Sequence, residues 1–239
     1  MADSDYRLWH LLLVGAGAAA TLLAVLIALF KEDVRAWWRH PALQASIRLR
    51  PPECHKIEIA FLDDSTGRIR ARAPCYYFRI WVENTGTVRA EQVQVYVSRL
   101  LRKHTQGHFK QVDNFIPMNL RWAMGPQPPE RPEVFAAGIS PKMGKHCDLG
   151  RIVDPKAYQH MRPTFEGVAA DATVMELDLE VQSLTNSHVI IPGTHRLEIV
   201  LAAANCLPIK KTLELTLTGY WFDSEAQMFA EGIALKEIL

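Results

Sequence analysis

The sequence lacks a charge excess of either sign. Its 239 residues include 27 lysines and arginines against 26 acidic residues, which gives a formal net charge of +1. A chain so evenly balanced has no bulk electrostatic attraction for nucleic acid or for an acidic substrate. The alternating row Arg68, Arg70 and Arg72 could bind phosphate, but such a row is more often the solvated face of an edge strand. We therefore expect no nucleic-acid partner.

Cysteine is scarce as well. The four cysteines, Cys54, Cys75, Cys147 and Cys206, are far apart and form no Cys-x-x-Cys pair. This spacing is not that of a small disulfide-built scaffold, although an oxidising compartment would still permit three pairings. In the cytoplasm the thiols would stay reduced, and Cys206, inside an apolar stretch, would be a small core residue.

Signatures of catalysis are missing too. The chain contains no Gly-x-Ser-x-Gly, Ser-x-x-Lys or His-Glu-x-x-His motif and no glycine-rich phosphate loop after a strand. His104 and His108 are four residues apart, but Gly107 between them is typical of a hairpin tip, and the adjacent His146, Cys147 and Asp148 match no metal-site spacing. The sequence therefore predicts a protein that is not an enzyme, with no catalytic residue, cofactor or metal site.

One long apolar run is present near the N-terminus. Residues 8–30 contain no Asp, Glu, Lys or Arg, and a helix of this length extends about 34 Å, enough to cross a bilayer core of roughly 30 Å. Two alternatives are a buried core helix and a cleaved signal peptide, although Asp3 and Asp5 beside a lone Arg7 fit a signal peptide poorly. We expect a short N-terminal tail at 1–7, a transmembrane helix at 8–30 and a juxtamembrane segment at 31–43. If the helix continues past the bilayer, His40-Pro41 is expected to end it, since the residue before a proline disfavours the α region.

Aromatic and basic residues flank this run in the pattern of a membrane helix. Tryptophan and tyrosine mark both interfaces, and Lys and Arg gather on the cytoplasmic side. The N-terminal flank offers only Arg7, whereas the C-terminal flank offers five basic residues between positions 31 and 50. The C-terminal part is thus predicted to be cytoplasmic, with lipid contacts at the membrane interface. The interface residues are Tyr6, Trp9, Lys31, Arg35, Trp37, Trp38 and Arg39.

Small residues recur at helical spacing inside the run. Rows of small residues four apart let two helix backbones approach closely in lipid. Such a row predicts association with a membrane-protein partner or with a second copy of the chain, although alanine is also simply common in bacterial membrane helices. The helix-packing residues are Ala16, Gly17, Ala20, Thr21, Ala24 and Ala28.

Beyond residue 43 the pattern changes to a period of two. Apolar and polar residues alternate at 93–97, 175–181 and 213–217, which predicts strands with one buried and one solvated face. No helical period of ten or more residues occurs there, so we expect an antiparallel β-sandwich at 44–222 rather than a parallel sheet. Further strands are expected at 57–61, 77–83 and 196–202, and weaker ones at 45–49, 109–112 and 146–152.

Residues 103–171 are less regular, and we interpret them as an insertion in the domain. They include a proline-rich stretch at 125–132 that cannot be a central strand. Long loops are often functional, with a passive insertion as the alternative. The candidate partner-binding residues in this stretch are Pro126, Pro128, Pro129 and Arg131.

The last segment, 223–239, is predicted to be a C-terminal tail. A helix start at Asp223-Ser224-Glu225 precedes an apolar stretch that Gly232 interrupts. An apolar terminus either docks on its own domain or binds a partner, and both alternatives are open. The candidate partner-binding residues are Met228, Phe229, Ile233 and Leu235.

Two stretches resemble bacterial immunoglobulin-like domains, including the cell-adhesion-related type. Residues 78–95 have the form strand, Asn84-Thr85-Gly86, strand, and 192–197 resemble the entry to a late hairpin of that class. The resemblance implies a mainly β fold, with one N-terminal transmembrane helix followed by an antiparallel immunoglobulin-like β-sandwich. It also implies a binding or scaffolding role without catalytic residues. Such domains are mostly extracytoplasmic, which conflicts with the orientation predicted from the charges.

Two functions of different class are compatible with these features. In the first, a single-pass protein of the bacterial inner membrane acts as a non-catalytic protein-binding, scaffold or accessory subunit of a membrane complex. In the second, the sandwich of a membrane-tethered sensor binds a ligand or foreign component and signals by oligomerisation. A subunit would co-purify with a fixed partner at constant ratio, whereas a sensor would change its oligomeric state with ligand.

Overall fold

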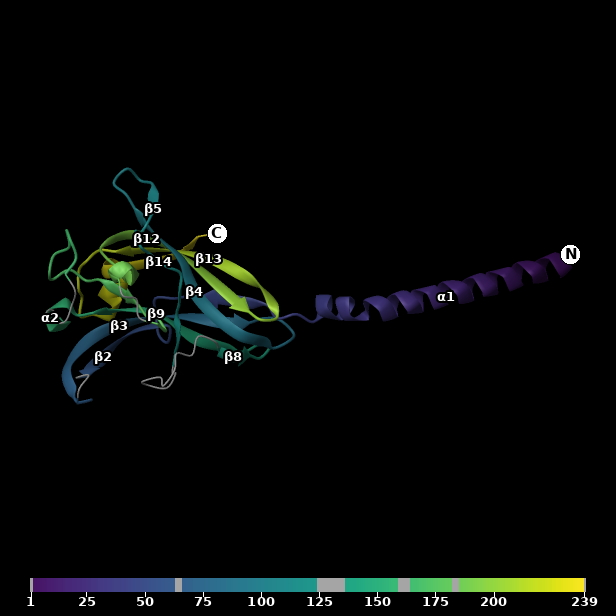
Figure 1. Ribbon diagram of the computed structural model, residues 1–239, viewed down its shortest axis with the longest axis horizontal. Coiled ribbons are helices and arrows are strands. Elements are labelled where there is room, and N and C mark those ends of the chain that lie inside the picture. Colours follow the sequence, from purple (N-terminus) through teal and green to yellow (C-terminus); the bar gives the residue numbers. More distant parts are fainter. Residues whose placement is uncertain (1, 63–65, 124–135, 159–163, 182–184, 239) are drawn as a thin grey trace. The chain divides into compact units, whose positions relative to one another are not determined.

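The computed structural model describes residues 2–62, 66–123, 136–158, 164–181 and 185–238. The chain divides into two compact units, Met1–His40 and Pro41–Leu239. The first unit is a helix and the second is built from β-strands (Figure 1). Each unit is considered by itself.

Helix α1 runs from Ala2 to Trp38 and ends just before His40-Pro41, as predicted from the restriction that proline places on the residue before it. Its segment Leu12–Lys31 has a mean hydropathy of 2.5, and none of that segment is buried. The helix is therefore long and apolar enough to cross a membrane. The absence of burial contradicts the alternative of a core helix, and a membrane anchor and a signal sequence are the two interpretations that its length and composition permit.

The second unit contains two antiparallel sheets. In the first, called here the β3–β9 sheet, the strand order is β1-β3-β9-β10-β11, with β2 also on β3 and β7 also on β9. The long β3 therefore pairs with β2 along its first half and with β1 at its end. The strands are β1 (Leu43–Ser46), β2 (Cys54–Leu62), β3 (Ile69–Asn84), β7 (Arg121–Trp122), β9 (Gly144–Val153), β10 (Met175–Leu177) and β11 (Val189–Ile190).

The second sheet, called here the β4–β12 sheet, has the order β14-β13-β12-β4-β5, with β6 and β8 also on β4. In the described part of the second unit, the helical turns are α2 (Pro155–Tyr158), η1 (Asn186–His188), α3 (Glu225–Gln227) and η2 (Met228–Gly232), and none exceeds five residues. The predicted mainly β, antiparallel character is thus confirmed. The strands are β4 (Ala90–Lys103), β5 (Phe109–Gln111), β6 (Met118–Asn119), β8 (Ala136–Ile139), β12 (Gly193–Ala203), β13 (Cys206–Leu217) and β14 (Ile233–Ile238).

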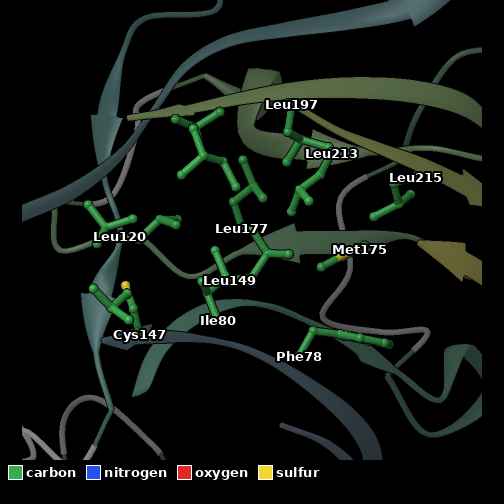
Figure 2. Packing of buried hydrophobic residues seen from close by; sticks show 14 of the residues in the cluster. Phe78, Ile80, Leu120, Cys147, Leu149, Met175, Leu177, Leu197, Leu213 and Leu215 are labelled. Carbon is green, nitrogen blue, oxygen red and sulfur yellow. The ribbon is translucent and has the colours of Figure 1, made fainter. Parts of the chain in front are cut away.

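Side chains from both sheets form one hydrophobic core. Figure 2 shows Phe78 and Ile80 of the β3–β9 sheet with Leu197 and Leu213 of the β4–β12 sheet, and all four belong to the same buried cluster. The predicted alternation is confirmed at 93–97 in β4 and at 213–217 in β13, where every second residue is buried. The core residues from these two strands are Val93, Val95, Val97, Leu213, Leu215 and Leu217.

The predictions for 175–181 and for 103–171 need correction. Strand β10 covers only Met175–Leu177, Val181 is 64% exposed, and the polar residues Asp178 and Glu180, expected on a solvated face, are only 6% and 8% exposed. Residues 103–171 are not a single excursion, because β9 lies inside them and pairs with both β3 and β10. The proline-rich stretch with Pro126, Pro128, Pro129 and Arg131 lies outside the described residues.

The C-terminal segment docks on its own domain. The side chain of Ser224 caps α3, and after η2 the strand β14 pairs with β13 from Leu217↔Ile233 to Thr212↔Ile238. Met228 and Ile233 are buried, and Phe229 and Leu235 pack against the same core. Of the two alternatives for this apolar segment, the structure shows docking. Met228 and Ile233 are core residues, and Phe229 and Leu235 are partly buried against the core rather than exposed on a free tail.

The buried side chain of Asn84 joins three loops where the chain enters the β domain. Its Oδ1 accepts hydrogen bonds from the backbone N–H groups of Ala42 and Gly86, at 3.1 and 3.0 Å. Its Nδ2 donates to the carbonyl oxygens of Val88 and Ile139, at 2.7 and 2.9 Å. Asn84 is fully buried, so these four bonds satisfy an amide that has no access to water.

We predict that Asn84→Ala destabilises the β domain by about 3 kcal/mol, because it leaves buried backbone donors and acceptors without partners. The matched control is Asn205→Ala, because Asn205 also joins two loop segments through hydrogen bonds to Glu91 and Arg89 but is exposed. We expect a loss of about 1 kcal/mol or less for the control. Urea unfolding of the full chain in detergent, followed by tryptophan fluorescence, measures both changes. Equal losses for the two variants would contradict the role given to Asn84.

Candidate functional site

The outer face of the β3–β9 sheet is unusually polar and closely packed. Successive side chains of a strand point to opposite faces, so the core positions Phe78 and Ile80 place Tyr77 and Arg79 on the outer face. The strand register sets Tyr77 opposite Arg151 and Arg79 opposite Asp148. The neighbouring strands β7 and β10 add more charges to this face, and together these residues form what we call the charge cluster: Tyr77, Arg79, Arg121, Asp148, Arg151, Glu176 and Asp178.

Asp178 lies at the centre of the charge cluster. The hydroxyl of Tyr77 donates to its Oδ2 at 2.6 Å. One guanidinium nitrogen of Arg121 and one of Arg151 each lie 3.9 Å from its carboxylate oxygens. A carboxylate that is 6% exposed is thus stabilised by one neutral donor and two positive charges.

Two shorter ion pairs flank this centre. Arg79 Nε lies 2.8 Å from Asp148 Oδ1, and Arg151 Nη2 lies 3.2 Å from Glu176 Oε2. The members of the first pair come from β3 and β9, and those of the second from β9 and β10. The ion pairs therefore join three adjacent strands on the face opposite the hydrophobic core.

The charge cluster shifts the protonation equilibria of its members. The pKa of Asp148 is raised to about 6, mainly by burial and in addition by the negative charge of Asp178, while Arg79 opposes both effects. Burial and the adjacent Asp178 raise the pKa of the Tyr77 hydroxyl, so Tyr77 stays a donor. Burial would lower the pKa of Arg151, but Asp178 and Glu176 raise it overall and keep the guanidinium charged.

A recess opens beside the charge cluster. Its volume is about 370 Å³. Arg121 and Arg151 both line this recess. The Nε–H group of each is buried and has no acceptor among the residues that the structure describes. Three carboxylates against two guanidinium groups give the lining an acidic excess. The lining residues are Arg121, Arg151, Glu176, Leu177, Asp178, Leu179, Glu180 and His188. A polar ligand group that enters here meets charges of both signs held in fixed positions.

Only part of this site can be recognised from the sequence. Alternation at 175–181 marks Glu176, Asp178 and Glu180 as sharing one face, which was interpreted as solvated. Their basic partners lie on other strands and far away in the sequence, at Arg121 and Arg151. Only the pairing of β7, β9 and β10 brings them together, and no local pattern predicts that pairing.

The predicted helix residues lie on α1 and are not part of the recess. The side chains described as exposed there include all six helix-packing residues, Ala16, Gly17, Ala20, Thr21, Ala24 and Ala28. Thr21 Oγ1 donates to the carbonyl of Gly17 at 2.8 Å. Of the predicted interface residues, Trp9, Lys31 and Arg39 are exposed, and the side chains of Tyr6, Arg35, Trp37 and Trp38 are outside the described part of the chain.

The histidines considered as metal ligands lie at two separate places in the domain. His104 and His108 stack at the tip of the β4–β5 hairpin, with ring centroids 5.3 Å apart and Gly107 at a φ of 86°. His146 packs against Trp81 instead, with ring centroids 4.7 Å apart. Within the described ranges, no three His, Cys, Asp or Glu side chains are grouped so that they could hold a metal ion.

The cysteines have free thiols. Burial raises the pKa of Cys54 and of Cys75 to about 12, and it also raises the pKa of Cys147 and Cys206. Thiolate is the nucleophilic and metal-binding form of cysteine. These four side chains are therefore poor nucleophiles near neutral pH.

Comparison of the chain with protein-family models, with curated proteins and with solved structures gives no match. Function is therefore argued from the geometry of the site.

We predict that Asp148 makes the stability of the β domain depend on pH. Its pKa is higher in the folded chain, about 6, than the usual 3.8, so the folded state binds the proton more tightly between these values. The contribution of Asp148 to stability is complete below pH 4 and is lost as the pH rises through 6.

The test compares wild type with Asp148→Asn, which cannot titrate, in urea unfolding at pH 4.5 and pH 7.5. The free energy of unfolding of wild type, relative to the variant, should fall by roughly 2 kcal/mol over this range. Glu58→Gln is the control, because Glu58 is in an exposed ion pair with Arg72. A relative stability of Asp148→Asn that does not change with pH would contradict the prediction.

Proposed function

We propose that the chain is a single-pass membrane protein whose β domain binds a partner protein without catalysis, as an accessory or scaffold subunit of a membrane complex. The observation that carries this proposal is the charged recess of about 370 Å³ on the outer face of the β3–β9 sheet. Binding functions of β-domains lie in sites on their loops and faces, so the recess is the proposed contact with the partner.

The lining of the recess supports a protein partner. Pockets for small molecules are lined mainly by apolar and aromatic side chains, whereas five of the eight residues here are charged. Because carboxylates outnumber guanidinium groups, the recess suits a lysine or arginine side chain of the partner. Fixed charges of both signs then set the register and the specificity of the contact.

The helix supports attachment to a membrane. Segment Leu12–Lys31 meets the requirements of length and hydropathy, and basic residues are concentrated after it rather than before it. We propose that α1 is a retained anchor in a bacterial inner membrane, with the β domain in the cytoplasm. The small-residue row from Ala16 to Ala28 is the proposed contact with a partner helix or a second copy.

An immunoglobulin-like sandwich is the fold within this proposal. Two antiparallel sheets that share one core support it, as does the β3–β4 connection that runs through Asn84-Thr85-Gly86. A binding role is the usual use of such a scaffold.

A second candidate function is a membrane-tethered sensor. The volume of the recess is within the range of about 300–1,000 Å³ typical of small-ligand sites. In this case a small polar molecule with groups of both charges would occupy the recess, and the helix would oligomerise on binding.

We predict that variants of the recess lose a partner that wild type retains. Glu180→Gln removes one acidic charge from the lining, and His188→Trp fills part of the volume. The control Glu198→Gln removes a carboxylate from an ion pair with Arg99, 3.0 Å long, on β4 and β12. Gentle detergent extraction from native membranes, affinity purification and mass spectrometry measure the partner-to-bait ratio.

Wild type and Glu198→Gln should retain a partner at constant ratio, and the two recess variants should retain at most about one tenth of it, since buried charged contacts contribute 2 kcal/mol or more. If all four proteins retain the same partner, the recess is not the contact surface. If wild type holds no partner and its oligomeric state changes with an added polar metabolite, the sensor function replaces the subunit function.

We also predict the orientation of the anchor. A green fluorescent protein fused after residue 239 should be fluorescent in bacterial cells, and alkaline phosphatase at the same position should be inactive, because five basic residues follow the apolar segment and one precedes it. Active phosphatase on a membrane-bound fusion would place the β domain outside, and active phosphatase on a soluble, shortened protein would indicate a cleaved signal sequence.

A further inference from the structure

The tip of the β12–β13 hairpin presents an apolar side chain to solvent. Leu207 is 86% exposed, more than any of the large apolar side chains described on α1, which reach 70%. Met143, in the turn before β9, is 61% exposed. A leucine exposed to this extent at a hairpin tip has no role in the packing of its own domain.

Hydrogen bonds place both residues at one end of the β domain. Asn84 N–H donates to the carbonyl of Met143 at 3.0 Å, and the Asn84 side chain bonds the carbonyl of Val88. Arg89 follows Val88 in the chain, and its carbonyl oxygen accepts a hydrogen bond from Asn205 Nδ2 at 2.9 Å. Asn205 in turn lies two residues before Leu207. Figure 1 shows the β12–β13 hairpin and the start of β4 at the same end of the domain.

The chain enters the β domain at this same end. The carbonyl of Ala42 accepts from the backbone N–H of Thr85 at 2.7 Å, and the N–H of Ala42 donates to Asn84 Oδ1 at 3.1 Å. The apolar segment of α1 ends at Lys31, the helix ends at Trp38, and Pro41 begins the β unit. With residues 31–38 helical, the distance from Lys31 to Pro41 is therefore at most about 20 Å.

Exposed basic side chains lie at the same end of the domain as these two apolar residues. Arg89, Lys142 and Lys145 are exposed at this end, against the acidic Glu83 and Glu91. Lys142 Nζ donates to the carbonyl of Thr85 at 2.9 Å, which fixes it beside the entry point of the chain. Exposed apolar residues among basic ones are the pattern of a surface that lies on anionic lipid.

We infer that this end of the β domain, with Leu207, Met143, Arg89 and Lys142, docks on the headgroup layer of the bilayer that α1 spans. The inference rests on the membrane anchor of the proposed function and extends it to a second lipid contact. Leu207 and Met143 enter the apolar boundary of the headgroup layer, and Arg89 and Lys142 contact lipid phosphates. The recess variants do not affect this contact, because its residues are not in the recess lining.

The test uses the full chain in vesicles of phosphatidylcholine and phosphatidylglycerol. A diazirine-bearing amino acid replaces Leu207, Met143 or, as a matched control, Leu62, which is 57% exposed. Leu62 pairs with Ile69 at the start of β3, whereas Asn84 is at its end, so the control lies at the far end of the long strand. Irradiation followed by mass spectrometry measures the phospholipid adduct at each position.

We expect several-fold more lipid adduct at Leu207 and Met143 than at Leu62. Arg89→Gln with Lys142→Gln should reduce the adduct at Leu207 by about fivefold for each charge removed, since a basic residue near an anionic surface contributes about 1 kcal/mol. Equal adducts at Leu207 and Leu62, or an adduct to protein in place of lipid, would overturn the inference. An adduct insensitive to the two charge substitutions would overturn its anionic-lipid part.

Extraction of the vesicles with alkaline carbonate separates this outcome from failure of the proposed function. A chain that leaves the vesicles is not anchored by α1, and both proposals then fail. A chain that stays embedded without an adduct at Leu207 keeps the anchor and refutes only the docking.

Discussion

The alternation of side chains along β3 is the constraint on which both the hydrophobic core and the charge cluster depend. This one strand has a central place in its sheet, and its inward residues Phe78 and Ile80 lie in the core shared with the second sheet. Its outward residues Tyr77 and Arg79 belong to the charge cluster. A slip of one residue in register would exchange the two sets, burying charges in the core and exposing the large apolar side chains. Core and charge cluster therefore specify the same register from opposite sides.

The charge cluster contributes to the fold more through the order of the strands than through stability. Removing two opposite charges from water costs several kcal/mol for each ion, and attraction between them offsets that cost only with good geometry and further hydrogen bonds. The separations of 3.9 Å from Asp178 to Arg121 and Arg151 are longer than the 2.8 Å contact of Arg79 with Asp148. The cluster is thus better suited to fixing strand order and presenting polar groups than to adding stability.

Sequence reasoning was accurate where one strand contains its own signal. The alternation at 93–97 and 213–217, the helix end before Pro41 and the hairpin around Gly107 each depend on neighbours in the chain, and the structure confirms all of them. The charge cluster was missed because its partners come from different strands and meet only through sheet pairing. The solvated face expected for Asp178 was wrong for the same reason, since a polar residue that alternates with apolar ones can be buried when another strand supplies its counter-charge. The C-terminal apolar segment docks because β13 offers it an edge to pair with, and no local sequence pattern predicts that edge.

The hydrogen bonds of Ala42 to Asn84 and Thr85 fix the point at which the chain enters the β domain. If α1 is retained in the bilayer, the β domain searches a thin layer next to the membrane rather than the whole volume of the cell. A partner in the same membrane then meets the domain at an effective concentration in the millimolar range, as for two modules joined by a short linker. Under that confinement a polar contact of modest intrinsic affinity is enough for a stable complex. The specificity of the recess for its partner then matters more than its affinity for that partner in solution.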